Sequence, residues 1–129
     1  MTYEIIAPKT VHPTKGYSHA VRMGDLIFVS GQVSQDTAGN IVAKGDVRAQ
    51  AEQVFANLKA VLEAAGSSLD RIGKITVFTV KPEYRPAIAE VREKVFAQVG
   101  HYPASTYVVI SQLAVPDWLV EIEAIAMLK

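Results

Sequence analysis

The chain contains no cysteine, and this absence removes several classes of chemistry at once. Without thiols there can be no disulfide bond, no thiolate nucleophile and no cysteine-based metal site. The three histidines, His12, His19 and His101, are not spaced as metal ligands are. We therefore expect no bound metal, and we expect His19 to have a surface or structural role.

Net charge and long apolar runs are missing as well. Thirteen basic and thirteen acidic residues cancel, so electrostatics give no reason to expect binding to nucleic acid or to anionic membranes. No apolar run approaches the roughly 18 residues needed to span a bilayer. The first residues, Met1 to Lys15, do not resemble a signal peptide. We expect a cytoplasmic protein with neither nucleic acid nor membrane as a partner.

What the sequence does contain is enough apolar material for one core. Half of the 129 residues are hydrophobic, and there is no repeat, linker or low-complexity stretch. A chain of this length and composition is typical of one folded domain, which we place at residues 1–129.

Two segments have the apolar spacing of helices. Asp46 is the expected N-cap of the first helix, and Gly66 is the expected stop. The second helix is expected to start near Arg85, with Pro86 in its first turn, and to end at Gly100. The apolar stripe of the first helix consists of Ala51, Val54, Phe55, Leu58, Val61, Leu62 and Ala65.

Six further segments are predicted to be strands. They are residues 3–6, 20–22, 25–30, 71–80, 105–113 and 119–128. The element order is therefore β-β-β-α-β-α-β-β. Because strand–helix–strand crossovers are right-handed, both helices should lie on the same face of one mixed sheet. The predicted fold is an α+β sandwich with two helices on one face.

Several of these strands are apolar on both faces, as at residues 26–29 and 107–110. Two helices can cover only one face of the sheet. The other face would leave a large apolar patch in water, which soluble monomers avoid. We therefore expect a homo-oligomer that assembles through the open face of the sheet.

Seven short motifs follow one another along the chain. They are Gly16-Tyr17-Ser18, Val29-Ser30-Gly31-Gln32, Asn57-Leu58-Lys59, Ala64-Ala65-Gly66, Thr76-Val77-Phe78, the segment from Pro103 to Tyr107, and the segment from Leu119 to Ala124. Together they resemble the RidA/YjgF family of reactive-intermediate deaminases over nearly the whole chain. The resemblance implies a chorismate-mutase-like α+β fold. It also implies a homotrimer whose sheets form a central barrel, with small-molecule clefts at the subunit interfaces.

The resemblance further implies a chemistry and a set of site residues. Deaminating members hydrolyse enamines and imines such as 2-aminoacrylate, and they need no metal or organic cofactor. In such members an arginine of the signature clamps the substrate carboxylate, and a glutamate near the chain end helps to place a water. By position, Glu121 matches that catalytic glutamate, and Tyr17, Ser30 and Gly31 match substrate-binding residues.

Three pocket positions depart from the family's pattern. Ser105 replaces the arginine, Tyr107 replaces a cysteine common in the family, and Ala89 stands where an asparagine is often found. A serine has no charge, so it cannot replace an arginine–carboxylate fork, in which each charged bond is worth roughly 1.5–3 kcal/mol. Strand alternation puts Ser105 and Tyr107 on one face, and Tyr107 adds bulk there. We interpret both as lining a remodelled substrate pocket, smaller or less suited to anions.

Each candidate also has an ordinary structural explanation. Glu121 could belong to the polar face of a half-exposed strand, Tyr17 could anchor the core, and Gly31 could give backbone freedom at a strand end. Ser105 is not expected to be a nucleophile, because neither a G-x-S-x-G motif nor a His–Asp pair accompanies it.

Three functions remain open on the sequence alone. The first is a cofactor-independent deaminase of a small imine or enamine, which the retained Tyr17, Ser30, Gly31 and Glu121 favour. The second is a homotrimer that binds a metabolite without catalysis, which the missing arginine favours. The third is the older family label of endoribonuclease, which is disfavoured by the zero net charge and the lack of a basic stripe.

Overall fold

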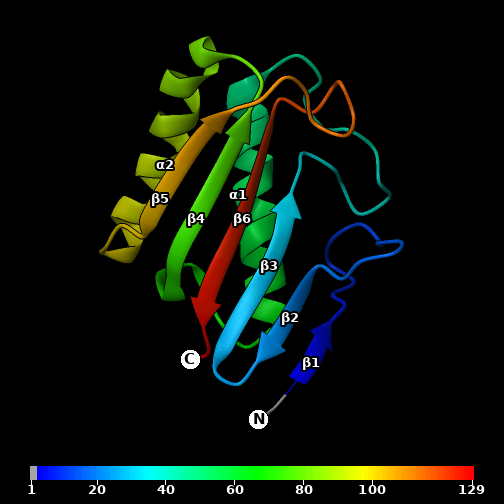
Figure 1. Ribbon diagram of the computed structural model, residues 1–129, viewed down its shortest axis with the longest axis vertical. Coiled ribbons are helices and arrows are strands. Elements are labelled where there is room, and N and C mark those ends of the chain that lie inside the picture. Colours follow the sequence, from blue (N-terminus) through cyan, green and yellow to red (C-terminus); the bar gives the residue numbers. More distant parts are fainter. Residues whose placement is uncertain (1–2) are drawn as a thin grey trace.

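A six-stranded mixed sheet is the frame of the protein in the computed structural model, which describes residues 3–129 (Figure 1). The strands are β1 (Tyr3–Ile6), β2 (Ala20–Met23), β3 (Leu26–Gln32), β4 (Ile72–Thr79), β5 (Ala104–Val109) and β6 (Val120–Met127). Their spatial order is β1-β2-β3-β6-β4-β5, and only β4 and β5 are parallel. The predicted order of elements along the chain is confirmed.

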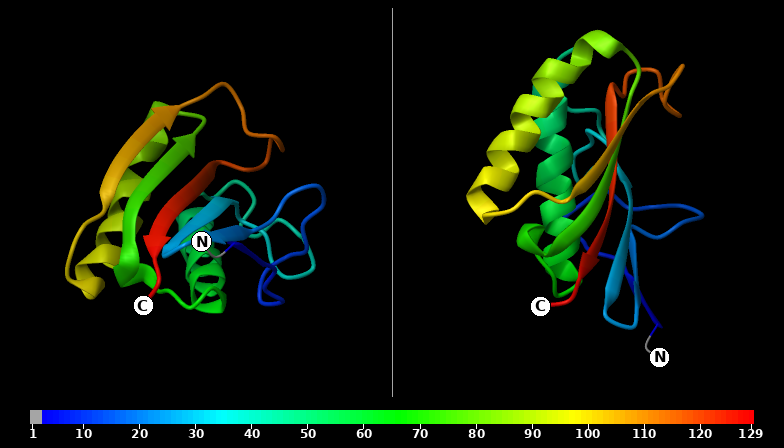
Figure 2. Two further views of the ribbon diagram at one scale, coloured as in Figure 1. Left: turned by 60° about the horizontal axis from the view of Figure 1, so that its bottom comes forward. Right: turned by 60° about the vertical axis from the view of Figure 1, so that its left-hand side comes forward.

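Two helices, α1 (Val47–Ala64) and α2 (Arg85–Val99), lie on the same face of the sheet (Figure 2). The predicted ends of both are confirmed. The side chain of Asp46 accepts a hydrogen bond from the backbone N–H of Ala49, and the chain leaves the helices at Gly66 and Gly100, whose φ angles are 82° and 90°. Two short 3₁₀ helices, Leu69–Arg71 and Pro82–Tyr84, precede β4 and α2. The helices therefore form one layer and the sheet the other, as the α+β prediction requires.

Strand β6 shows how the sheet divides its two faces. Its buried residues are Val120, Ile122, Ala124 and Ala126, which belong to the core beneath the helices. The residues between them, beginning with Glu121, point to the face that carries no helix. Across the helix layer, the rings of Phe55 and Phe96 meet edge to face at 5.8 Å and join α1 to α2.

The open face carries a broad apolar surface over β1, β2, β3 and β6. By strand register, its exposed large side chains are Tyr3, Ile5, Met23, Leu26, Phe28, Ile125 and Met127. Phe28 and Ile125, which stand opposite each other on β3 and β6, are each 38% exposed. The uncovered apolar face expected from the sequence is therefore present in this chain.

The predicted fifth strand runs too far at its end, and the predicted fourth and sixth strands each exceed the observed strand by one residue at both ends. Strand β5 ends at Val109 and not at residue 113, because its neighbour β4 ends opposite it at Thr79. Beyond that point only the backbone N–H of Ile110 bonds to the Thr79 carbonyl, and a longer β5 would have no partner. Strand β6 begins at Val120, after a connection that leaves the sheet.

Candidate functional site

Glu121 and Gly31 pack directly against each other, from the neighbouring strands β6 and β3. A Cβ atom added at Gly31 would lie only 2.6 Å from Cδ of Glu121. No larger residue fits there while the carboxylate keeps its position. The backbone of Gly31 does not have a positive φ. Gly31 is thus required for space beside the carboxylate, and not for the backbone freedom that a glycine at a strand end suggests.

Tyr17, in the loop before β2, completes this cluster. Burial raises the pKa of the Glu121 carboxyl, and the negative charge of Glu123 raises it further. Burial likewise raises the pKa of the Tyr17 hydroxyl, and the nearby charge of Glu121 adds to that shift. A carboxyl group whose pKa is raised accepts a proton more readily than a solvated carboxylate does, which favours a role in general acid–base catalysis.

Ser30 does not present a free hydroxyl to this cluster. Its Oγ donates a hydrogen bond to the carbonyl of Ser18 at 2.6 Å, and its backbone N–H donates to the carbonyl of His19 at 2.8 Å. Both bonds fasten the loop that carries Tyr17 to strand β3. The structure therefore gives Ser30 the role of positioning Tyr17.

A buried polar cluster of Gln32, His12 and His19 lies beneath that loop. The amide of Gln32 donates to Nδ1 of His19 at 3.2 Å and to the carbonyl of Ser30 at 3.0 Å. Nε2 of His19 then donates to the carbonyl of His12 at 2.6 Å, in the tautomer that carries the hydrogen on Nε2. Burial, together with His19, lowers the pKa of His12. His19 thus has a structural role, whereas the contributions of His12 and Gln32 were not predicted.

Ser105 and Tyr107 lie on the opposite face of the sheet from Glu121. On the parallel neighbour β4 they stand opposite Ile75 and Val77, both of which are buried beneath the helices. The same-face prediction for Ser105 and Tyr107 is confirmed. Within one chain, however, these two residues share no cleft with Glu121, because the sheet itself separates them.

The two residues instead line a surface hollow of about 560 Å³ between β5 and α2. Two arginines of α2 that the sequence reasoning missed also line it. Nη1 of Arg92 is 3.5 Å from Oγ of Ser105, and the guanidinium carbon of Arg85 is 5.4 Å from the centre of the Tyr107 ring. Their spacing in the sequence could have indicated both arginines, because residues 85, 89 and 92 lie on one face of a helix.

Comparison with known proteins shows the family to which this chain belongs. The family model of endoribonuclease L-PSP matches residues 7–128. This chain belongs to that family. The RidA/YjgF resemblance of its motifs is thereby confirmed.

Relatives across nearly the full length agree with this assignment. A RutC family protein of Pyrococcus horikoshii is 39% identical over 93% of this chain and 90% of its own. A protein of Dermatophagoides farinae named 2-iminobutanoate/2-iminopropanoate deaminase is 32% identical, over 96% of this chain and 92% of its own. Among solved structures, the YjgF gene product of Escherichia coli has a TM-score of 0.89 and 33% identity, covering 98% of this chain and 99% of that one. These structures confirm the RidA/YjgF-like fold.

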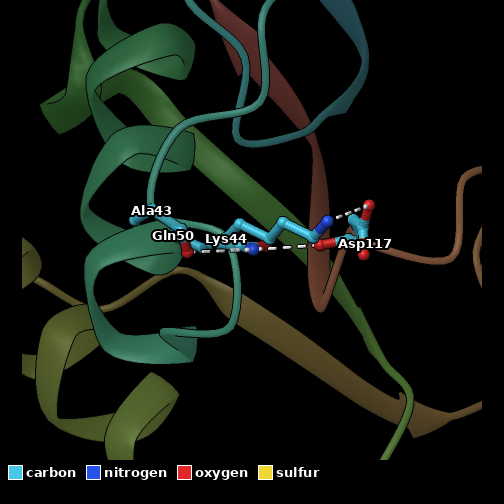
Figure 3. Close-up of polar contacts among 4 residues, drawn as sticks. All are labelled: Ala43, Lys44, Gln50 and Asp117. Carbon is cyan, nitrogen blue, oxygen red and sulfur yellow. Dashed lines mark hydrogen bonds and ion pairs between the residues drawn. The ribbon is translucent and has the colours of Figure 1, made fainter.

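In this family member, buried Gln50 of α1 fixes the connection that leads into β6. Its amide nitrogen donates to the carbonyls of Ala43 at 3.3 Å and Asp117 at 3.0 Å (Figure 3). Its amide oxygen accepts a hydrogen bond from the backbone N–H of Leu119 at 2.9 Å. At the surface, Lys44 pairs with Asp117 at 3.5 Å. Gln50 therefore sets the entry of β6, two residues before Glu121, and this role was not predicted.

Other features of the described chain do not add to the site. The larger groove, of about 730 Å³, runs between α1 and α2 and is lined by side chains of both charges. Within residues 3–129, no group of three acidic or histidine side chains is arranged to hold a metal ion. No helix in that range has the length and apolar character needed to cross a membrane.

Proposed function

We propose that this protein is a cofactor-independent hydrolase of small imines, with Glu121 as its acid–base group. The observation that carries the proposal is the cluster on the open face. There, a partly buried carboxyl with a raised pKa is held against the backbone of Gly31 beside the phenol of Tyr17. Such a group can accept a proton from an attacking water and return it to a leaving nitrogen.

The reaction requires two proton transfers, which one carboxyl can perform in turn. In the first step, water adds to the carbon of the protonated C=N bond while the Glu121 carboxylate takes one proton from the water, which leaves a neutral carbinolamine. In the second step, Glu121 returns that proton to the amino nitrogen and the C–N bond breaks. The remaining hydroxyl proton passes to the departing ammonia as the carbonyl forms, so the products are a 2-oxo acid and ammonium. The hydroxyl of Tyr17 is suited to orienting the water. Neither step needs a redox cofactor.

We further propose that the working site combines two copies of the chain in a homotrimer. Glu121 and Tyr107 lie on opposite faces of one sheet, so they can act on one small molecule only if they come from different copies. The exposed apolar face around Phe28 and Ile125 supports the same idea, because a second copy would bury it. On this proposal the small-molecule cleft lies at the subunit interface.

The names of relatives support an imine as the substrate. The Dermatophagoides farinae relative is named as a deaminase of 2-iminobutanoate and 2-iminopropanoate, and a solved Escherichia coli relative, TdcF, 34% identical, was crystallised with bound serine. Both names point to short molecules with a carboxylate. Endoribonuclease activity, which the family description mentions, is not favoured, because the net charge is zero.

The proposal is tested by following imine hydrolysis directly. An amino-acid oxidase can generate 2-iminopropanoate or 2-iminobutanoate, and semicarbazide can trap whatever imine survives. We expect the protein to lower semicarbazone formation, and Glu121→Gln to reduce the rate by about 10²–10⁴-fold. Glu63→Gln, an exposed acidic position on α1, is the matched control and should retain the wild-type rate.

Two outcomes would overturn the assignment. One is a Glu121→Gln protein that folds normally and hydrolyses imines as fast as the wild type. The other is a wild-type protein that accelerates hydrolysis of no imine in a broad panel. In the second case, thermal stabilisation by short 2-oxo acids would favour the metabolite-binding alternative.

A further inference from the structure

The hollow between α2 and β5 brings two positive charges to one spot. Arg85 and Arg92 are seven residues apart and project from the same face of α2. Nη1 of Arg92 reaches the hydroxyl of Ser105 at 3.5 Å, and the guanidinium of Arg85 lies over the ring of Tyr107. The two side chains thus converge on one short segment of β5.

These charges are not neutralised by the described chain. Within residues 3–129 neither Arg85 nor Arg92 forms an ion pair, whereas Arg48 pairs with Glu90 at 2.9 Å. The carboxylate at the edge of the hollow belongs to Glu93, and its Oε1 accepts a hydrogen bond from the Tyr102 hydroxyl at 2.6 Å. An excess of positive charge therefore faces the hollow.

The Tyr107 hydroxyl is a second, independent observation that points to a ligand in the hollow. It is buried, yet it has no hydrogen-bond partner within residues 3–129. Burial raises the pKa of the Tyr107 hydroxyl, while the charges of Arg85 and Arg92 and a contact with the Thr79 side chain lower it. The Thr79 hydroxyl itself donates to the carbonyl of Leu119 at 2.7 Å, so it does not donate to Tyr107. Buried polar groups in folded proteins almost always have a partner, so an unpaired one calls for a ligand or a neighbouring chain.

Apart from Glu93 at its edge, the polar groups that converge on Ser105 and Tyr107 in the hollow are donors. Two guanidiniums can only donate, and the hydroxyls of Ser105 and Tyr107 are free to donate to an acceptor. An anion with two oxygens in one plane matches a guanidinium best. Ile75 and Phe96 form the buried floor of the hollow, and its exposed lining is mainly polar. The hollow thus suits a small carboxylate.

We propose that Arg92, assisted by Arg85, anchors the carboxylate of a short 2-oxo or 2-imino acid in this hollow. Arg92 would supply from helix α2 the guanidinium that position 105 of the strand does not have. This replaces the expectation of a pocket less suited to anions. The identity of the imino acid as substrate rests on the proposed function, but carboxylate binding can be measured without any catalysis.

The first experiment measures binding of two product-like probes, pyruvate and 2-oxobutanoate, to the full chain by calorimetry and by amide NMR shifts. We expect Arg92→Met to weaken binding by roughly 10–10²-fold, because one charge-assisted bond contributes about 1.5–3 kcal/mol. Arg92→Lys should retain part of the affinity, and Arg85→Met should lose less than Arg92→Met. Arg71→Met, at an exposed arginine in the turn before β4, is the matched control and should bind as the wild type does.

The neutral amide pyruvamide separates charge recognition from shape. It should bind the wild type much more weakly than pyruvate and should not distinguish wild type from Arg92→Met. The shifted amides should lie at residues 102–107 and along α2. If pyruvate and 2-oxobutanoate do not bind, or if Arg92→Met and Arg92→Lys both bind them as the wild type does, the anchor is not Arg92 and the inference is wrong.

The outcome is separable from that of the deaminase proposal. If the wild type binds pyruvate through Arg92 yet hydrolyses no imine, the anchor stands and the deaminase falls. If the wild type hydrolyses imines, we expect Arg92→Met to raise KM for 2-iminopropanoate more than it lowers kcat, and to lose much less on an imine without a carboxylate. Equal kinetic constants for wild type and Arg92→Met on both imines would overturn the anchor and leave the deaminase intact.

Discussion

The two sides of the sheet handle different parts of the proposed chemistry by different means. On the open face, Glu121 is fixed by close packing against Gly31, with Tyr17 held in place through Ser30. In the hollow on the helix side, Arg92 reaches toward Ser105 from a neighbouring element, and within residues 3–129 its guanidinium forms no ion pair. Proton transfer needs a fixed geometry, so it depends on rigid packing. A carboxylate is bound by the planar fork of a guanidinium, and this group is offered by helix α2 and not by strand β5.

The largest effect on the rate of imine hydrolysis is expected from a change at Gly31, which packs tightly against Glu121. In Gly31→Ala, the new methyl group would overlap the Glu121 side chain and force it to move. A displacement of about 1 Å in a catalytic group can cost 10²-fold in rate, so we expect at least that loss in kcat for imine hydrolysis. Gly73→Ala on β4 is the control, because its nearest contact would be an ordinary 4.0 Å. Equal rates for the two variants would mean that the Glu121–Gly31 contact does not matter.

The hollow should tolerate a move of its positive charge from position 92 on helix α2 to position 105 on strand β5. The structure places Arg92 within 3.5 Å of Ser105, at the spot that a new arginine would occupy. We therefore expect Ser105→Arg alone to suffer repulsion from Arg92. In the double variant Ser105→Arg/Arg92→Met, we expect about tenfold recovery of the pyruvate affinity lost in Arg92→Met. Calorimetric titration of the three variants decides this. A double variant no tighter than Arg92→Met would show that the two positions are not interchangeable.

A change at Gln50 tests whether its hydrogen bonds to Asp117 and Leu119 support the position of Glu121 on the open face. Gln50→Leu would leave the backbone N–H of Leu119 and the carbonyl of Asp117 without their partner. A buried group left unpaired costs about 1–3 kcal/mol, so the free energy of unfolding should fall by that amount in urea titration. The activity of Glu121 should fall with it, while pyruvate binding in the hollow should hardly change. Gln53→Leu, whose amide bonds only to Asn57 of the same helix, should cost less.

The smallest effect concerns pH and the stability of Glu121 itself. Its pKa is raised in the folded protein, so the folded state binds protons more tightly than the unfolded state. This contribution to stability is fully present below the unfolded pKa and is lost as the pH rises through the folded pKa. Glu121→Gln should therefore raise Tm relative to the wild type at pH 7 to 8 and lose this advantage near pH 4. A Tm difference that does not change with pH would argue against the raised pKa.

Local signals in the sequence predicted the helices correctly. Asp46, Gly66 and Gly100 set the helix ends through their own backbone and side-chain chemistry, which does not depend on the rest of the fold. Alternation likewise placed Ser105 and Tyr107 on a common face. The end of β5 was missed because it is set by the length of β4, which is a property of the partner strand.

The site was harder to predict because its contacts join distant segments. Ser105 and Glu121 face opposite ways because they stand opposite Ile75 and Phe78 of β4, and the sequence does not specify this register. Arg92 meets Ser105 only because α2 packs beside β5. Gln50 had a weak signal, as a polar residue next to an apolar helix stripe, but its partners lie 67 and 69 residues away. Such long-range pairs need the assembled fold.

The central claim is that one working site joins the open face of one copy to the hollow of another. It is tested most directly by mixing two defective proteins, Glu121→Gln and Arg92→Met, through unfolding and refolding together. If the site is shared between copies, random assembly gives about a quarter of the interfaces both intact residues, and about a quarter of the wild-type kcat/KM should return when the imine concentration is well below KM. Each variant refolded alone should stay defective. If the mixture is no more active than the average of its two components, both residues act within one chain or not at all, and the account is wrong.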